Sequence, residues 1–216
     1  MITDRQVTKR DWVIVALCMI IPLFSFYYMD THSIVRCGVD VFRSIFSGRF
    51  GDFYAFAKES QLDGLMGHEP TYDIIFYLTV GIWEFPIAVI ETVMNISFRH
   101  NTIVMMYSKT LLLIFVVLSS GMIRKIAIEL GISKKNAEWT QYMFLTSGFI
   151  YAYTCIAGQY DIIGIFFSLV GVYYYLKDDM KKFGLLFIVA VQYKFFPVFF
   201  QKKHENQHCS CYYINS

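Results

Sequence analysis

Four consecutive residues, Gly158-Gln159-Tyr160-Asp161, place an amide and a carboxylate between two strongly apolar runs, 139–157 and 162–176. Together these two groups offer hydrogen-bond donors and acceptors, which suits the orientation of hydroxyl groups. A charge so close to hydrocarbon is costly, so an acid at a membrane surface or in a polar cavity is a candidate functional residue. An ordinary polar turn joining two helices is the alternative interpretation.

Three more charged residues lie in or beside apolar runs: Asp30, Lys109 and Lys194. The carboxylate of Asp30 can act as a general base, and the alternative interpretation is a solvated acid at a helix end. A lysine can face a cavity or extend its apolar stem so that the ammonium reaches the surface. Lys109 lies near the start of its run, so we expect it to snorkel or to pair with an acid.

The composition is that of an integral membrane protein. Hydrophobic residues make up 56% of the chain, the mean hydropathy is +0.45, and charged residues make up 17%. Ordinary soluble domains have about 25% charged residues. Aromatic residues, 19% of the chain, gather near the ends of apolar runs, where rings sit at headgroup level. The net charge of +2, with no dense basic run, argues against nucleic acid as a partner.

The apolar runs predict an all-α fold, a polytopic bundle of transmembrane helices with a partly helical first outer loop at 30–71. In that loop Val35, Val39, Phe42, Ile45 and Phe46 recur at helical spacing, which predicts an amphipathic helix along the membrane surface. The membrane region comprises residues 1–200. Its expected spans lie near 12–29, 72–94, 103–122, 139–157, 162–176 and 183–200.

Charge predicts the orientation of these spans. The basic N-terminal flank and the basic loops 124–135 and 177–182 should be cytoplasmic. The turn at 158–161 and the loop at 30–71 then face outside. This orientation requires that residues 72–94 enter and leave the membrane on the same side. Gly81, Glu84 and Pro86 predict a break in the helix there.

Residues 201–216 differ in character from the rest of the chain. They form a polar tail, which we interpret as an out-of-frame ending of a longer membrane protein. The tail holds Cys209 and Cys211 close to two histidines, but their spacing does not match that of a zinc site, and no metal ligands are assigned. Cys18 and Cys155 lie in apolar runs and are expected to be small core residues.

The order of these features resembles the N-terminal part of the GT-C superfamily of polytopic glycosyltransferases, in particular its mannosyltransferase-like members. The resemblance covers roughly residues 10–200. Many members show an Asp-Glu or Asp-x-Asp pair in the first outer loop, whereas here Asp30 is followed by Thr31 and His32. Members also have many more spans. The resembling segments are Tyr28-Met29-Asp30-Thr31-His32, Gly48-Arg49-Phe50-Gly51-Asp52-Phe53-Tyr54, Pro70-Thr71-Tyr72-Asp73-Ile74, Gly158-Gln159-Tyr160-Asp161 and Gln192-Tyr193-Lys194-Phe195-Phe196-Pro197.

The resemblance implies a catalytic base in the outer loop. Transfer of a sugar from a polyprenyl-phosphate donor needs a carboxylate near the acceptor hydroxyl, and cations or a metal to stabilise the departing phosphate. Asp30 is the expected base because it ends the first span at headgroup height, with Asp40 and Asp52 as alternates. His32 is expected to assist Asp30 or to bind a divalent metal ion with it. No other cofactor is implied.

The resemblance also implies the substrate-binding residues. Gln159 and Asp161 are expected to orient sugar hydroxyls, and Lys194 to bind the lipid phosphate. Tyr160 and Tyr72 are expected to stack on a sugar or, as is more common, to anchor the chain at the interface.

The expected function is sugar transfer on the outer face of the membrane, with the polyprenyl-phosphate-linked sugar and membrane lipid as partners. The expected location is a bacterial cytoplasmic membrane. The alternatives are a transporter or channel fragment and a truncated, inactive membrane fragment. The acids cluster at one face and no inverted repeat is visible, which disfavours transport.

Overall fold

The computed structural model describes residues 6–25, 29–62, 70–98 and 101–193, with only the backbone described at 29, 30, 61 and 62. Within these ranges the chain is all-helical, as the sequence predicts, and contains no strand. The long helices are α1 (Lys9–Ile20), α2 (Met29–Phe46), α3 (Phe53–Leu62), α4 (Ile74–Met94), α5 (Thr102–Glu129), α6 (Lys134–Leu145), α8 (Asp161–Leu176) and α9 (Met180–Tyr193). Short turns of helix complete the fold: Ile21–Phe24, Phe50–Asp52, α7 (Gly148–Tyr151) and a π-helical turn, Ala152–Ile156.

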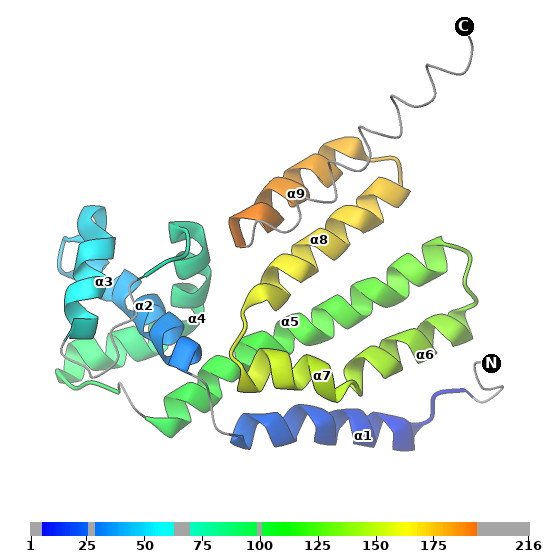
Figure 1. Ribbon diagram of the computed structural model, residues 1–216, viewed down its shortest axis with the longest axis horizontal. Coiled ribbons are helices and arrows are strands. Elements are labelled where there is room, and N and C mark those ends of the chain that lie inside the picture. Colours follow the sequence, from blue (N-terminus) through cyan, green and yellow to red (C-terminus); the bar gives the residue numbers. More distant parts are fainter. Residues whose placement is uncertain (1–5, 26–28, 63–69, 99–100, 194–216) are drawn as a thin grey trace, which may run out of the picture.

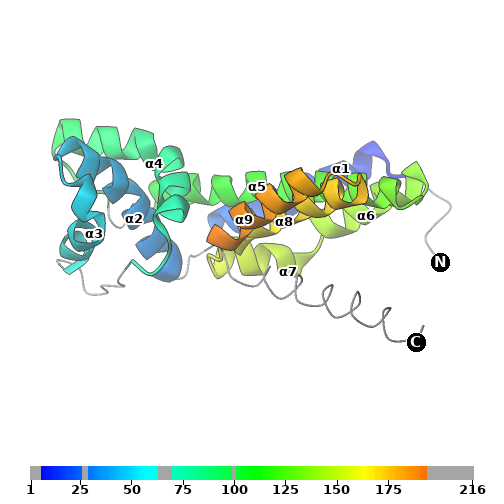
Figure 2. The same ribbon diagram turned by 90° about the horizontal axis from the view of Figure 1, so that it is seen from above.

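The helices form two groups, which Figures 1 and 2 show side by side. Helices α1, α5, α6, α7, α8 and α9 form an elongated bundle, in which α5 packs against α6 and α8, and α8 packs against α9. Helices α2, α3 and α4, here called the cap, lie at one end of this bundle, with α2 packed against both α3 and α4. One apolar core, which includes Tyr77 and Val80 of the cap and Leu112 and Tyr160 of the bundle, joins the two groups.

Helix α5 links the two groups because it is longer than a membrane crossing requires. Its 28 residues span about 42 Å at 1.5 Å per residue, whereas the hydrocarbon core of a bilayer is about 30 Å thick. Two helices, α4 and α5, are long and apolar enough to cross a bilayer. The run at 162–176 forms the shorter apolar helix α8.

The predicted break in 72–94 is wrong, since α4 runs without interruption through Gly81, Glu84 and Pro86. Gly81 instead serves helix packing: a Cβ there would lie 2.9 Å from the carbonyl oxygen of Gly38 on α2. The absence of side chains at both glycines lets the two helix backbones approach closely. Gly81, which suggested a break in the helix, therefore serves a close contact between α2 and α4.

Two predicted spans are not single helices. Helix α1 ends at Ile20 and gives way to a 3₁₀ turn containing Pro22, so the expected helix at 12–29 stops early. Proline lacks the backbone N–H that an α-helix would use at that position. The run at 139–157 is divided at Thr146 and Ser147, between α6 and α7, and then becomes π-helical. Of the expected span at 183–200, residues up to Tyr193 lie in α9 and the rest lie outside the described residues.

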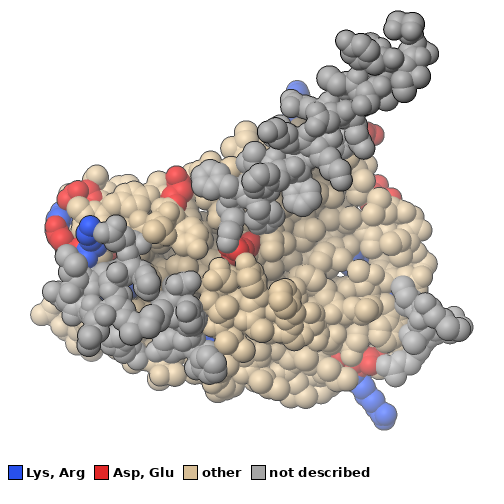
Figure 3. Space-filling view, in the orientation of Figure 1, with Lys and Arg blue, Asp and Glu red and all other residues tan. Residues whose placement is uncertain are grey.

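The basic connections gather at the end of the bundle opposite the cap. Figure 1 shows the start of α1, the α5–α6 connection and the α8–α9 connection at this end. Ion pairs join them, with Lys177 Nζ 2.7 Å from a carboxylate oxygen of Glu129 and Arg124 3.1 Å from Glu138. In Figure 3 the charged side chains lie mainly at the margins of a largely uncharged face. The basic segments therefore lie at one end of the bundle, and their cytoplasmic location stays a prediction.

The predicted amphipathic helix is present as α2, but half of its apolar side is used inside the protein. Val35 and Val39 are buried, whereas Ile45 and Phe46 near its C-terminus are exposed. The expectation that this face lies on a membrane is therefore wrong for the buried residues, because α4 covers α2.

A buried network of charges fastens the cap together. The guanidinium of Arg36 on α2 donates hydrogen bonds to both carboxylate oxygens of Glu91 on α4, at 2.9 and 3.1 Å. It also lies 3.1 Å from the carboxylate of Asp40. Asp40 also accepts hydrogen bonds from Arg43 and Ser60, and Glu91 accepts one from the backbone N–H of Phe98. Burial raises the pKa of the Asp40 carboxyl, while Arg36, Ser60 and Arg43 act to lower it. The arginine is thus the partner that allows two buried acids to stay in the cap.

Replacing Arg36 with methionine is predicted to lower the free energy of unfolding by about 3–5 kcal/mol, because it leaves buried acids unpaired. The matched control is Arg49→Met, which breaks exposed pairs with Asp52 and Glu59. The control is expected to cost at most about 1 kcal/mol. Thermal and denaturant unfolding in detergent measure both, and equal effects of the two variants would contradict a structural role for the buried network.

Candidate functional site

The cap meets the bundle where Gly158 lies against Thr31. Gly158 has a φ of +68°, and a Cβ at this position would lie 1.8 Å from Thr31 Oγ1 and 3.2 Å from Thr31 N. Only glycine combines this backbone conformation with so close an approach. Asp30 immediately precedes Thr31 on α2, so the beginning of α2 lies at the 158–161 turn. The side chain of Asp30 itself lies outside the described residues.

Asp161 is built into this junction as the first residue of α8 and is 6% exposed. The hydroxyl of Tyr153 donates a 2.6 Å hydrogen bond to its Oδ2 atom. A carboxylate at a helix N-terminus is further stabilised by the free N–H groups of the first turn and by the helix dipole. Gln159 is half-buried, and its backbone N–H donates to the carbonyl of Tyr153. The turn is therefore held by the π-helical turn that precedes it.

An aromatic cluster closes the junction from the side of α4. The ring of Tyr160 lies 5.9 Å from that of Phe76, which stacks on Tyr72 at 4.3 Å and lies 6.2 Å from Tyr193. Tyr160 is 1% exposed. Its ring packs inside the protein, so the expectation that it stacks on a sugar or anchors at the interface is wrong in this conformation.

Two buried hydroxyl groups at the junction have no hydrogen-bond partner among the described residues. They belong to Thr31, which touches Gly158, and to Tyr160, two residues further along the turn. Burial raises the pKa of the Tyr160 phenol, and the nearby Glu84 carboxylate of α4 adds to the rise. Buried hydroxyls are normally paired. The junction thus combines a buried carboxylate with hydroxyls that have hydrogen-bonding capacity to spare.

Lys109 fixes the chain on the way to this junction. The lysine is 1% exposed on α5, and its ammonium donates to the carbonyl oxygens of Pro22 and Ser25, at 3.1 and 2.8 Å, and to Ser25 Oγ. A cation is favourable there because the carbonyls at a helix C-terminus carry partial negative charge. Of the two expectations for Lys109, outward snorkelling is wrong: its ammonium caps the 3₁₀ turn Ile21–Phe24 that follows α1.

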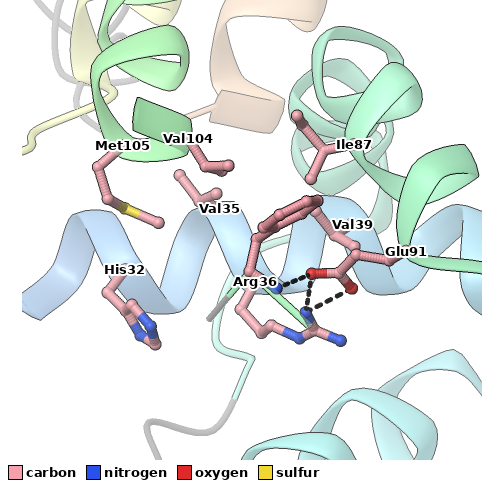
Figure 4. Close-up of a pocket in the computed structure, with 9 residues that line it drawn as sticks. His32, Val35, Arg36, Val39, Ile87, Glu91, Val104 and Met105 are labelled. Carbon is pink, nitrogen blue, oxygen red and sulfur yellow. Dashed lines mark hydrogen bonds and ion pairs between the residues drawn. The ribbon is translucent and has the colours of Figure 1, made fainter. Parts of the chain in front are cut away.

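His32 lines a shallow hollow at the α2–α4–α5 contact, shown in Figure 4. The apolar side chains of Val35, Val104 and Ile87 form one part of its lining, and the Arg36–Glu91 pair forms another. His32 directly follows Thr31 and lies within the first turns of α2. The described parts of the chain contain no group of three or more histidine, cysteine, aspartate or glutamate residues that could hold a metal ion.

The remaining expected site residues lie elsewhere. Asp40 belongs to the buried charge network, nine residues along α2 from Thr31, or about 14 Å at 1.5 Å per residue. Asp52 is exposed and pairs with Arg49 at 3.3 Å. Lys194 lies outside the described residues. The structure thus brings the start of α2 and the 158–161 turn together but leaves both alternate acids away from them.

Comparison of the chain with protein-family models, with curated proteins and with solved structures found no match.

Sequence reasoning missed the contacts that hold the junction. The pairing of Arg36 with Asp40 has a weak signal, since residues four apart share a helix face. No sequence signal indicates the pairing of Arg36 with Glu91 or the capping by Lys109, because each contact joins residues at least 55 positions apart. For Gly158 the sequence indicated a polar turn, but it gave no sign that Thr31 would be the contacting residue.

Gly158→Ala is predicted to lower the free energy of unfolding by more than the roughly 1–2 kcal/mol that left-handed backbone conformation alone costs a non-glycine residue. The excess comes from the overlap with Thr31. Gly48→Ala and Gly131→Ala are matched controls, since both have positive φ and open space around the added Cβ. Unfolding in detergent measures the three variants. If Gly158→Ala costs no more than the controls, the close approach to Thr31 is absent.

Lys109→Met is predicted to lower the free energy of unfolding by about 1.5–3 kcal/mol, because it removes charge-assisted hydrogen bonds to Pro22 and Ser25. Lys125→Met, at an exposed position on the same helix, is the control and should change it by less than about 0.5 kcal/mol. Hydrogen exchange of the segment around residues 22–35 should rise in the first variant alone. Unchanged exchange in Lys109→Met would argue against its capping role.

Proposed function

We propose that this chain is an integral membrane protein of the glycosyltransferase type, which transfers a sugar from a polyprenyl-phosphate donor to an acceptor on the outer face of the membrane. The observation that carries the proposal is the contact between Thr31 and Gly158. It supports a shared site, because it joins the segment after Asp30 to the turn that bears Gln159 and Asp161. The resemblance assigns the first of these segments to catalysis and the second to sugar binding.

The bilayer location is supported by apolar side chains that face outward on the bundle. On α1 they include Val13, Leu17 and Ile21 at its end, and on α9 they include Leu185 and Ile188, all more than half exposed. Large apolar patches on a protein surface mark an interaction with lipid or protein. The bundle therefore presents a lipid-compatible surface between the basic connections at one end and the cap at the other.

In the proposed reaction Asp30 removes the proton from the acceptor hydroxyl, whose oxygen forms a bond to the anomeric carbon of the sugar. The bond between that carbon and the phosphate oxygen breaks, and the polyprenyl phosphate leaves with the bonding electron pair. Lys194 is the proposed cation for the phosphate, and a divalent ion near His32 and Asp30 is the alternative. Gln159 and Asp161 orient the sugar hydroxyls.

Asp30→Asn is predicted to reduce sugar transfer at least about 100-fold, since an amide cannot act as a general base. Vesicles that contain the full chain are incubated with radiolabelled polyprenyl-phosphate-linked mannose or glucose, and release of the sugar from the lipid is measured. Membrane insertion should be unchanged.

Glu59→Gln is the matched control, because it removes an exposed carboxylate from the same cap. It should transfer at the wild-type rate. An Asp30→Asn variant with wild-type activity would remove Asp30 from the mechanism, and loss of transfer in Asp52→Asn instead would assign the base to the alternate. Absence of transfer in the wild-type chain would contradict the proposed function.

Transport is the second candidate, favoured by one observation: the interrupted helix between α6 and the 158–161 turn. Transporters use such interruptions to form binding sites near the bilayer midplane. Here the polar turn lies at the cap end of the bundle instead (Figure 1). Uptake of a labelled sugar into sealed vesicles without chemical change would favour transport over transfer.

A further inference from the structure

Helix α4 carries an apolar stripe along its outward side. The stripe consists of Ile75, Ile82, Phe85, Ile90 and Val93, whose spacings of seven, three, five and three residues place them on one side of the helix. All of them are exposed, with Ile82 at 69% and Val93 at 78%. Five exposed apolar side chains on one side of a single helix differ from the singly scattered apolar residues of ordinary protein surfaces.

The charges of α4 lie on its other side. Glu84 and Glu91 are 0% and 4% exposed, and Glu91 pairs with Arg36 of α2. Val80 and Ala88 on the same side are completely buried. An amphipathic helix with an uncharged outer face and charges turned toward the protein suits contact with hydrocarbon. Ile96, just after α4, and Ile103, at the start of α5, are also exposed.

The position of α4 decides how it meets the bilayer. Figures 1 and 2 show α4 beside α2, on the side away from α3, beyond the end of the bundle and away from the basic connections. Helices α1 and α5 both have one end at the cap and the other at the basic end. The α6–α7 segment, α8 and α9 run between the same two ends. Successive bundle segments therefore run alternately toward the cap end and toward the basic end, and this alternation needs no membrane crossing by α4.

We propose that α4 lies within the outer leaflet, entering and leaving it from the outer side, with its apolar stripe against lipid. The occupant of the stripe is bilayer lipid, whereas on the acidic side Glu91 contacts α2 and Glu84 lies beside Ser108 of α5. This inference rests on the proposed bilayer location of the bundle but not on sugar transfer. Its consequence is that the cap holds the Thr31–Gly158 junction at the height of the lipid headgroups.

A full crossing by α4 would have a clear cost. It would move the start of α5 to the cytoplasmic side and put the basic 124–135 connection outside, against the positive-inside rule. It would also require Glu84 and the Arg36–Glu91 pair to cross the hydrocarbon, where charged groups are expensive. An outer-leaflet position keeps the basic 124–135 connection inside, and it leaves Glu84 and the Arg36–Glu91 pair on the outer side of the membrane.

Single-cysteine labelling tests this topology. In a background with Cys18, Cys209 and Cys211 replaced by serine, and the fully buried Cys37 and Cys155 retained, one exposed residue at a time becomes cysteine. Thr71→Cys and Ser97→Cys flank α4, and Lys134→Cys and Lys181→Cys mark the basic end. Intact cells are treated with a membrane-impermeant maleimide, before and after permeabilisation.

Positions 71 and 97 should label in intact cells, whereas 134 and 181 should label at least tenfold more after permeabilisation. Labelling of 71 in intact cells with 97 protected would show that α4 crosses, and would overturn the inference. Positions 134 and 181 on opposite sides would instead contradict the proposed orientation of the bundle. Labelling of all four positions in intact cells would overturn both the inference and that orientation.

Depth of insertion is the second readout. A bimane fluorophore at Val93→Cys should lose at least half of its emission in vesicles of brominated phosphatidylcholine, because bromine quenches fluorophores in the hydrocarbon. The same fluorophore at Glu59→Cys, on an exposed polar side of the cap, should keep its emission. Equal emission at both positions would show that the stripe faces water and would overturn the proposed contact with lipid.

Discussion

The close approach of Gly158 to Thr31 is the contact on which the relation between cap and bundle depends. A side chain at Gly158 would overlap Thr31, so the turn and the start of α2 can meet only while residue 158 is glycine. The surrounding structure maintains this contact from both sides. Lys109 caps the 3₁₀ turn that follows α1, and Tyr153 holds the carboxylate of Asp161 just after the 158–161 turn. Hydrogen bonds therefore hold elements on both sides of the contact.

The same need to pair polar groups explains the cap. Isolated charges inside a protein are costly, and a buried ion pair is tolerated when its hydrogen bonds are satisfied. Arg36 satisfies Glu91 and Asp40 together, which fixes α2 against α4 over the stretch where Gly38 and Gly81 let the backbones meet. Glu91 is thereby turned inward, Glu84 is buried beside Ser108 of α5, and the outer side of α4 is left apolar. One network of side chains thus sets both the fold of the cap and the surface that it offers to lipid.

The sequence predicted the helical class, the helix at α2 and the gathering of basic connections, because each follows from local spacing or from charge counts. It predicted wrongly where packing at a distance decides the outcome. Gly81 and Pro86 suggested a break, but Gly81 faces Gly38 of another helix, and α4 continues through both residues. Lys109 suggested a snorkelling side chain, but its partners lie in a segment more than 80 residues away. The meeting of the start of α2 with the 158–161 turn joins residues far apart in the sequence, and no local pattern encodes it.

A double-mutant cycle between residues 31 and 158 tests this meeting most directly. Gly158→Ala is made both in the wild-type chain and in a Thr31→Gly background, and the free energy of unfolding in detergent is measured for each variant. Because a Cβ at residue 158 would lie 1.8 Å from Thr31 Oγ1 and 3.0 Å from Thr31 Cβ, removal of the Thr31 side chain should relieve the overlap and lower the cost of Gly158→Ala. Gly131→Ala, which has open space around its added Cβ, should cost the same in both backgrounds. An equal cost of Gly158→Ala in the two backgrounds would contradict a junction between the start of α2 and the 158–161 turn.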